Sequence, residues 1–257
     1  MFIENPILAT DNCRYCLMCR HVCPVGHSTR LETLTPHGWG LLIASQRRGL
    51  LTWNASSIDK LFSCADCGLC RSHCVTDQPL PNAIAAARAE VAAQGIAPAA
   101  LYPLNEALLR WGNPYQPAEP QPPSGQGDIA LFVGDEALYL WPSALEAALT
   151  LLKAVGIEPV LIGASRSNGY LASSLGFPDT ARRLAKANLA DLEATIRATP
   201  VDVVVSGTPM DLGRIITVDL PLRRASYVLQ EVGSPTLADV LAPHIARWGG
   251  AQRSEAP

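Results

Sequence analysis

The pattern of apolar and polar residues gives the first part of the chain a helical character. Residues 40–48 form an apolar run of helical length, and Gly49 stands behind it as a candidate helix C-cap. Residues 58–62 predict another short helix. The alanine-rich stretch 81–94, followed by Gly95, predicts a longer one. We therefore expect helices and loops with few strands in this part.

The second part of the chain alternates between strand-like and helix-like runs. Residues 128–133 (DIALFV) and 158–162 have the pattern of strands, the first of them buried, and 201–206 (VDVVVS) that of a strand buried on both faces. Residues 142–155 predict an amphipathic helix and 178–198 a long helix. Strands that alternate with helices predict a small parallel α/β layer.

A proline-rich stretch lies between the two parts. Residues 113–127 (NPYQPAEPQPPSGQG) hold five prolines, which is typical of an extended, semi-rigid linker. A chain of 257 residues has room for two modest domains. We predict an α+β protein with a helical domain at 1–112, the linker at 113–127, an α/β domain at 128–248 and a disordered tail at 249–257.

The cysteines supply the chemistry. All eight fall into two runs of the same spacing, C-x2-C-x2-C-x3-C, which predicts ligands of [4Fe–4S] clusters. Three close cysteines can wrap three iron corners of a cube, whereas the fourth lies too far along the chain, and in two-cluster ferredoxins it ligates the other cluster. We therefore predict two [4Fe–4S] clusters, one held by Cys13, Cys16, Cys19 and Cys74, the other by Cys64, Cys67, Cys70 and Cys23.

Two other uses of the cysteines are less favoured. Structural zinc usually takes two C-x2-C pairs, so the third cysteine of each triplet would fit poorly. Disulfides need an oxidising compartment, and residues 1–10 have neither the basic region nor the apolar core of a signal peptide.

Net charge and hydropathy exclude two classes of interaction, with nucleic acids and directly with a membrane. The net charge of −3 argues against a nucleic-acid partner. No stretch approaches the roughly 18 unbroken apolar residues of a membrane helix, since even 145–155 contains Glu146 and Lys153. We expect a soluble, cytoplasmic protein that reaches a membrane only through a partner.

The segments CRYCLMCRHVCPVGHSTRLETLTPHGWGLL and CADCGLCRSHC resemble the α-helical, dicluster ferredoxin subunits of glycolate oxidase, anaerobic glycerol-3-phosphate dehydrogenase and heterodisulfide reductase. The resemblance covers about 80 residues and departs from the family at Val75, where a proline is common. It implies an iron–sulfur subunit that transfers electrons.

The second part resembles a single CCG domain, which follows the ferredoxin domain in several of these subunits. The resemblance lies in ALFVGD, VGIEPVLIG and VDVVVSGTPM, but the family's cysteines are missing. Asp135, Ser167–Asn168–Gly169 and Thr208–Pro209–Met210 stand in their places. We interpret this part as a degenerate, cysteine-free scaffold for docking.

Charged residues surround the cysteines. Four cysteines already close each cube, so we expect hydrogen bonding or surface charge, and not ligation, from the nearby histidines, which are His21, His27, His37 and His73. Positive charge near a cluster raises its reduction potential. Arg14, Arg20 and Arg71 are candidates for this role, with an ordinary solvated surface as the alternative.

These observations predict a non-catalytic electron-transfer subunit of an oxidoreductase complex. The expected partner is a flavoprotein dehydrogenase or reductase subunit. The acceptor would be a further electron-transfer flavoprotein, an iron–sulfur protein or a quinone-linked membrane subunit. The alternative is an iron–sulfur redox sensor or an assembly or structural subunit.

Overall fold

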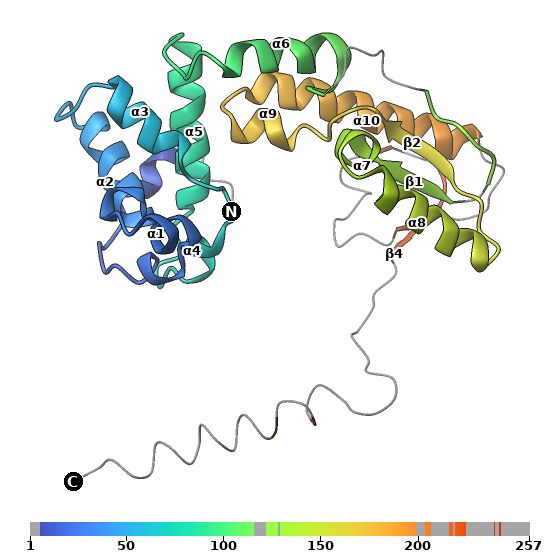
Figure 1. Cartoon of the computed structure of the whole chain (residues 1–257), viewed down its shortest axis with the longest axis horizontal. Helices are drawn as coiled ribbons and strands as arrows, with labels where there is room; N and C mark the ends of the chain where they lie inside the picture. Colours follow the sequence, from blue (N-terminus) through green and yellow to red (C-terminus); the bar gives the residue numbers. More distant parts are fainter. Residues whose placement is uncertain are drawn as a thin grey trace. The chain divides into compact units, whose positions relative to one another are not determined.

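A computed structural model describes residues 6–115, 122–127, 129–198, 204–206, 216–217, 219–224, 239 and 242 (Figure 1). Contacts between Cα atoms divide the chain into two units, Met1–Val201 and Asp202–Pro257. The described residues form a mixed α+β structure, which agrees with the predicted fold class at that level.

The first half of the larger unit is built from helices and loops. Between residues 6 and 115 no described residue belongs to a strand, so the predicted helical character is confirmed. The α-helices are α1 (Pro24–Thr29), α2 (Pro36–Arg47), α3 (Ala55–Phe62), α4 (Leu69–Ser72), α5 (Leu80–Ala93) and α6 (Leu101–Trp111). Three short 3₁₀ helices, Pro6–Thr10, Arg20–Val22 and Glu32–Leu34, lie among them.

Local sequence explains where these helices begin and end. The hydroxyl of Thr35 accepts a hydrogen bond from the Gly38 N–H at the start of α2, and Pro36 occupies the first turn. Asn54 forms a reciprocal capping box with Ser57 at the start of α3. Gly49 and Gly95 follow α2 and α5 with positive φ angles, as expected of residues that end a helix.

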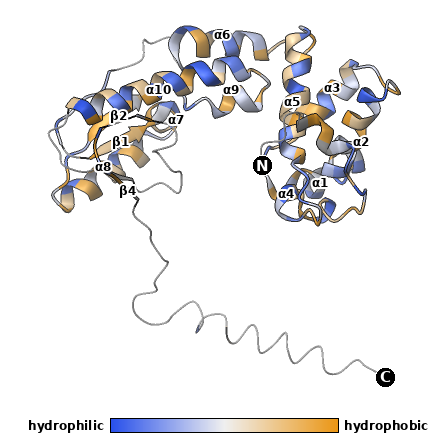
Figure 2. Ribbon diagram, turned by 180° about the vertical axis from the view of Figure 1, so that it is seen from behind, coloured by the Kyte–Doolittle hydropathy of each residue, from blue (hydrophilic) through white to orange (hydrophobic). Residues whose placement is uncertain are grey.

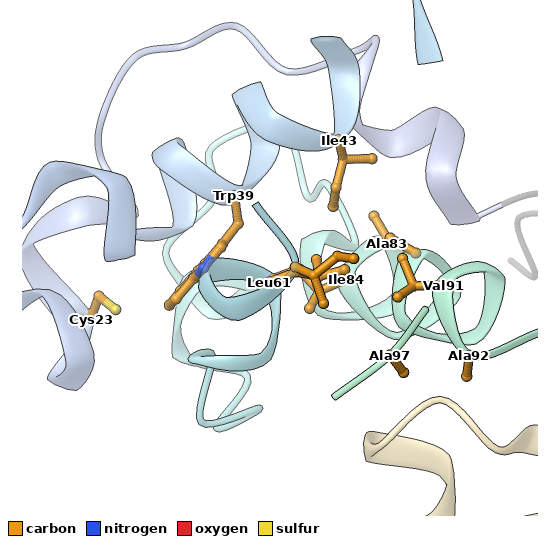
Figure 3. Packing of buried hydrophobic residues seen from close by; sticks show 11 residues of the cluster. Cys23, Trp39, Ile43, Leu61, Ala83, Ile84, Val91, Ala92 and Ala97 are labelled. Carbon is orange, nitrogen blue, oxygen red and sulfur yellow. The ribbon is translucent and has the colours of Figure 1, made fainter. Parts of the chain in front are cut away.

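Helices α2, α3 and α5 enclose the main hydrophobic core (Figure 3). Trp39 and Ile43 of α2 face Leu61 of α3 and Ile84 of α5, and all four are almost completely buried. The Trp39 indole N–H donates to the Lys60 carbonyl at 2.6 Å, which satisfies the one polar atom of that ring. Burial of each large apolar side chain contributes about 1.5–3 kcal/mol. Cys23 belongs to the same core, so a predicted cluster ligand is part of its packing.

The second half of the larger unit is an α/β arrangement. Strand β1 (Ala130–Val133) pairs in parallel with β2 (Val160–Ala164), with Ala130 opposite Val160. Helices α7 (Gly134–Tyr139) and α8 (Pro142–Ala154) connect them, and α9 (Tyr170–Ser174) and α10 (Pro178–Ala198) follow. In the smaller unit, β3 (Val204–Ser206) pairs in parallel with β4 (Leu222–Arg224). The parallel pairing agrees with the prediction, but the three predicted strands do not form one layer: the described strands make two separate two-stranded sheets.

The prediction that 128–133 is a buried strand is wrong. Only Val133 of β1 is buried, and Phe132 keeps 42% of its surface exposed. The reason is incomplete cover: no residue of α8, the connecting helix, is buried in the structure. The predicted burial of 201–206 on both faces cannot be followed there, because residues 201–203 lie outside the described residues.

The two halves of the larger unit are in direct contact. Phe177, between α9 and α10, packs against the core of the helical half. Thr180 of α10 donates a hydrogen bond to the side chain of Asn105 in α6 at 2.7 Å. The Ser167 N–H donates to the Gly112 carbonyl at 2.8 Å. The two halves therefore belong to one compact unit. The boundary between the two units lies after Val201 and not at the proline-rich segment.

The described ends of that segment also contact the fold. Asn113 is fully buried, and Ser124 exchanges two backbone hydrogen bonds with Leu161 of β2 at 2.9 and 2.7 Å. Residues 116–121, the middle of the predicted linker, lie outside the described residues, as do most of 207–257. The domain boundaries at 112 and 128 stay a prediction.

Gly176 allows a close approach of main chain to main chain between the halves. It has a φ of +94°, and a Cβ there would lie 2.6 Å from the Arg88 carbonyl oxygen of α5. We predict that Gly176→Ala destabilises the protein more than Gly156→Ala, which has a similar φ of +78° but meets nothing within 4 Å. The left-handed conformation costs about 1–2 kcal/mol in both variants, and the backbone collision adds roughly 1–3 kcal/mol to the first.

Chemical denaturation measures this difference, and hydrogen exchange should show α9 opening more readily in Gly176→Ala. Equal destabilisation of the two variants would contradict the close approach of α9 to α5.

Candidate iron–sulfur sites

The two cysteine runs fold into loops of the same shape. In the first loop Tyr15 and Leu17 have positive φ angles of 51° and 65°; in the second, Asp66 and Gly68 have 52° and 74°. These residues stand two and four places after the first cysteine of each run. Such turns are sparsely populated by non-glycine residues, so their repetition indicates that both loops meet one geometric requirement.

Backbone N–H groups in these loops point at sulfur. The N–H of Tyr15 donates to Cys13 Sγ and that of Asp66 to Cys64 Sγ, both at 3.4 Å. Hydrogen bonds to sulfur stabilise a thiolate and are among the factors that set the potential of a cluster.

The cysteines line two adjoining pockets. The first is bordered by Cys13, Cys16, Cys19 and Cys74, and the second by Cys23, Cys64 and Cys67. Cys70 borders both pockets, as does Pro36 at the start of α2. The structure thus places the fourth cysteine of each run beside the first three of the other run.

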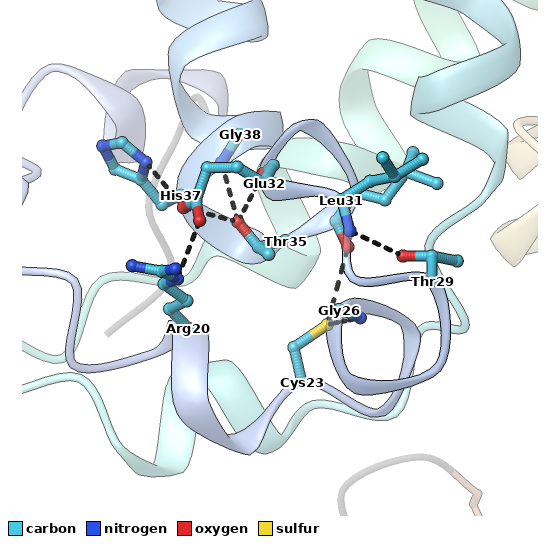
Figure 4. Close-up of polar contacts among 10 residues, drawn as sticks. Arg20, Cys23, Gly26, Thr29, Leu31, Glu32, Thr35, His37 and Gly38 are labelled. Atoms are coloured by element: carbon cyan, nitrogen blue, oxygen red, sulfur yellow. Dashed lines mark hydrogen bonds and ion pairs between the residues drawn. The ribbon is translucent and has the colours of Figure 1, made fainter.

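The two fourth cysteines are held by neighbouring helices and turns. Cys23 caps α1 and accepts from the Gly26 N–H at 3.4 Å (Figure 4). Cys74 accepts from the Gln78 N–H at 3.3 Å, and its Sγ lies 3.5 Å from the Thr76 hydroxyl. Main-chain N–H groups and a hydroxyl therefore hold both thiols in place.

Burial of the thiols changes their acidity. Desolvation raises the pKa of Cys19 to about 11 and that of Cys70 to about 12, and the charges of neighbouring cysteines add to both shifts. Burial also acts to raise the pKa of Cys74, but hydrogen bonds from Thr76 and Gln78 outweigh it, so that pKa is lowered. Because a metal or cluster binds thiolates, binding at these pockets would release protons.

The donor set fits a cluster. All eight cysteines are free thiols, and soft thiolates suit iron–sulfur clusters. In the described part of the chain, no three His, Cys, Asp or Glu side chains are placed to hold a single metal ion. A cube spreads its ligands over four iron corners, so thiols that line a pocket suit it better than they suit one zinc ion.

The charged residues near the loops are mostly paired. Arg20 Nε lies 2.7 Å from Glu32, whose second carboxylate oxygen lies 3.5 Å from His37 Nδ1 (Figure 4). Arg71 forms a long ion pair with Asp77 at 3.4 Å. Solvent exposure and pairing weaken the field of these arginines. Arg14 instead borders the first pocket.

Two histidines, one from each cysteine run, are in contact. The rings of His21 and His73 meet edge to face, with centroids 5.7 Å apart. His37 borders the first pocket and meets the Tyr15 ring in the same manner. His27 borders a separate hollow together with Arg30.

Sequence reasoning missed one residue beside the sites. Arg88 of α5 is buried and donates to the carbonyl of Cys64 at 2.7 Å. The alanine-rich sequence around Arg88 did not indicate this contact. The one available signal was that an arginine lies among the apolar positions of that helix.

In the second half, two of the positions that stand in place of CCG cysteines, Asp135 and Ser167, are buried, whereas Asn168 is exposed. Asp135 lies two residues after the end of β1 and Ser167 three residues after the end of β2, so both stand near the carboxyl ends of parallel strands. Burial raises the pKa of Asp135 to about 6, against backbone N–H groups that lower it. Thr208, Pro209 and Met210 lie outside the described residues.

Comparison with known proteins agrees with the pockets. Residues 9–78 match the family described as the 4Fe-4S dicluster domain. A stretch of 56 residues is 43% identical to part of arginine synthetase ArcE of Thermococcus kodakarensis. The matched stretch makes up 22% of this chain and 12% of that protein. No solved structure matches the chain. The matched domain points to an iron–sulfur protein of ferredoxin type that binds [4Fe–4S] clusters and suggests electron transfer.

Among the described residues, no helix is both long and apolar enough to cross a bilayer.

The arrangement of the pockets predicts an exchange of ligands between the runs. Cys23→Ser should perturb the cluster at Cys64, Cys67 and Cys70 and leave its sequence neighbour intact, because Cys23 borders only the second pocket. Cys74→Ser should perturb the cluster at the other triplet. Electron paramagnetic resonance of the reduced variants measures both effects. If each serine variant altered the cluster beside it in sequence, the crossed assignment would be wrong.

Proposed function

We propose that this chain is an electron-transfer iron–sulfur subunit of a multi-subunit oxidoreductase. Two [4Fe–4S] clusters, one at each cysteine-lined pocket, would pass single electrons between a flavin-containing partner and a downstream acceptor. The observation that carries the proposal is the pair of adjoining pockets bordered by all eight thiols.

The protein contributes position and access. When bound, such clusters accept and release single electrons. Cys70 and Pro36 border both pockets, so the two sites are direct neighbours. Electrons would therefore move from one cluster to the other over a short distance. Leu17, Met18 and Leu69, within the cysteine loops, are exposed and offer an apolar surface for contact with a partner.

We further propose that the second half docks the partner, as expected of a scaffold without cysteines. Helix α8 supports this role: Leu151 and Val155, four residues apart, are each 70% exposed, and Trp141 before the helix is also exposed. The ribbon of α8 carries hydrophobic stretches (Figure 2). Exposed apolar surface that is more than a scattering of single residues marks protein interaction sites. The predicted occupant is the flavoprotein subunit, which must stay attached while it delivers electrons.

The test is anaerobic isolation of the native complex through a tag on this chain. We expect flavin to co-purify, and rapid mixing with the substrate of the flavoprotein to reduce clusters on this chain. A preparation without flavin, in which the clusters decay in air and take no electrons from a partner, would contradict the proposal and favour the sensor alternative.

A pair of variants tests the docking surface in the same isolation. Leu151→Glu should lose the flavoprotein, because it places a charge within the exposed apolar surface. Lys153→Glu introduces the same side chain two residues away, on another face of α8, and should retain the complex. If both variants retained the flavoprotein, α8 would not be its docking site.

A further inference from the structure

Arg88 is a buried cation beside the second cysteine loop. Its side chain lies in α5 and the residue keeps only 2% of its surface exposed. Nε and Nη2 donate to the Leu61 carbonyl at 3.1 and 2.9 Å, and Nη2 also donates to the Cys64 carbonyl at 2.7 Å. Nη1 donates to the Ser174 carbonyl of α9 at 2.8 Å.

No carboxylate of the described residues forms a direct ion pair with Arg88, although the charge of Asp66 acts on it from a longer distance. The guanidinium donates its hydrogen bonds to main-chain carbonyls. The Asp66 carboxylate, in the same loop, accepts instead from the Tyr170 hydroxyl at 3.1 Å. The Phe62 ring lies 5.1 Å below the guanidinium and supplies only a weak attraction. A buried cation with no carboxylate in direct contact is costly.

A cluster at the second pocket would supply the missing charge. Four thiolates give a [4Fe–4S] cluster a net negative charge, which grows by one when the cluster is reduced. A fixed positive charge nearby, held away from water, favours the reduced form and raises the reduction potential. Cys64 borders that pocket, and its carbonyl is bound directly by Arg88.

We propose that Arg88 is the buried counter-charge of the cluster at Cys64, Cys67 and Cys70 and sets its reduction potential, and that α9 completes the enclosure of this charge. The inference rests on the proposed cluster sites. Arg88 acts here as a positioning and tuning residue, because it contacts the ligand loop and does not line the pocket.

Helix α9 contributes three contacts to the enclosure. Ser174 accepts from Arg88, and Tyr170 donates to both the carbonyl and the carboxylate of Asp66. Gly176, just after α9, approaches the main chain of Arg88 so closely that a Cβ would collide with it. The second half of the unit therefore influences the electron-transfer site without supplying a ligand.

The experiment uses the full-length protein with its clusters, titrated with redox mediators and followed by electron paramagnetic resonance. Arg88→Gln removes the charge, and the signal that Cys23→Ser perturbs should shift to a lower potential, with a smaller shift in the other signal. Arg71→Gln is the matched control: it removes an arginine from the second cysteine run itself, but one that is exposed and paired with Asp77, so its effect should be smaller.

Arg88→Lys keeps the charge but loses the fork of donors. We expect its potential to stay close to that of the wild type, and this variant decides the question if Arg88→Gln does not fold. The inference is overturned if Arg88→Lys shifts the potential as far as a neutral substitution, or if Arg88→Gln shifts it no more than Arg71→Gln. Absence of two cluster signals in the wild type would instead contradict the proposed function.

Discussion

One geometric constraint shapes the first half: each cysteine-lined pocket is bordered by the first three cysteines of one run and by the fourth cysteine of the other. Cys74 borders the pocket of the first run and Cys23 that of the second, so residues 13–23 and 64–74 must lie side by side. Helices α2 and α3 span the sequence between them, and their core with α5 holds both loops in place. Cys23 belongs to that core. The packing of this core therefore also fixes the position of a predicted cluster ligand.

Helix α5 extends this constraint to the α/β half. It follows the second cysteine run, contributes Ile84 and Val91 to the core, and carries Arg88 against the Cys64 loop. Through Ser174, Tyr170 and Phe177 the segment around α9 closes on the same region. A part of the chain that contains no cysteine thereby becomes part of the electrostatic surroundings of the proposed cluster.

Local signals made much of this structure predictable. Glycines behind apolar runs located the ends of α2 and α5, and the predicted range of α10 agrees with Pro178–Ala198. The cysteine spacing predicted two crossed sets of four ligands; the linings of the two pockets are compatible with these sets, and the ligation itself stays a prediction. The sequence did not reveal Arg88, because its partners Leu61 and Ser174 lie 27 and 86 residues away. The exposure of β1 was not predicted for a similar reason. The sequence DIALFV shows that the strand is apolar, but tertiary packing decides whether a helix covers it.

The central claim is that the eight thiols hold two cubane clusters. Iron and acid-labile sulfide, measured on protein purified without oxygen, test it most directly. The account predicts about eight irons and eight sulfides per chain, as two [4Fe–4S] clusters require. A preparation with zinc and no sulfide would contradict it, and half the predicted iron and sulfide would show that only one pocket holds a cluster.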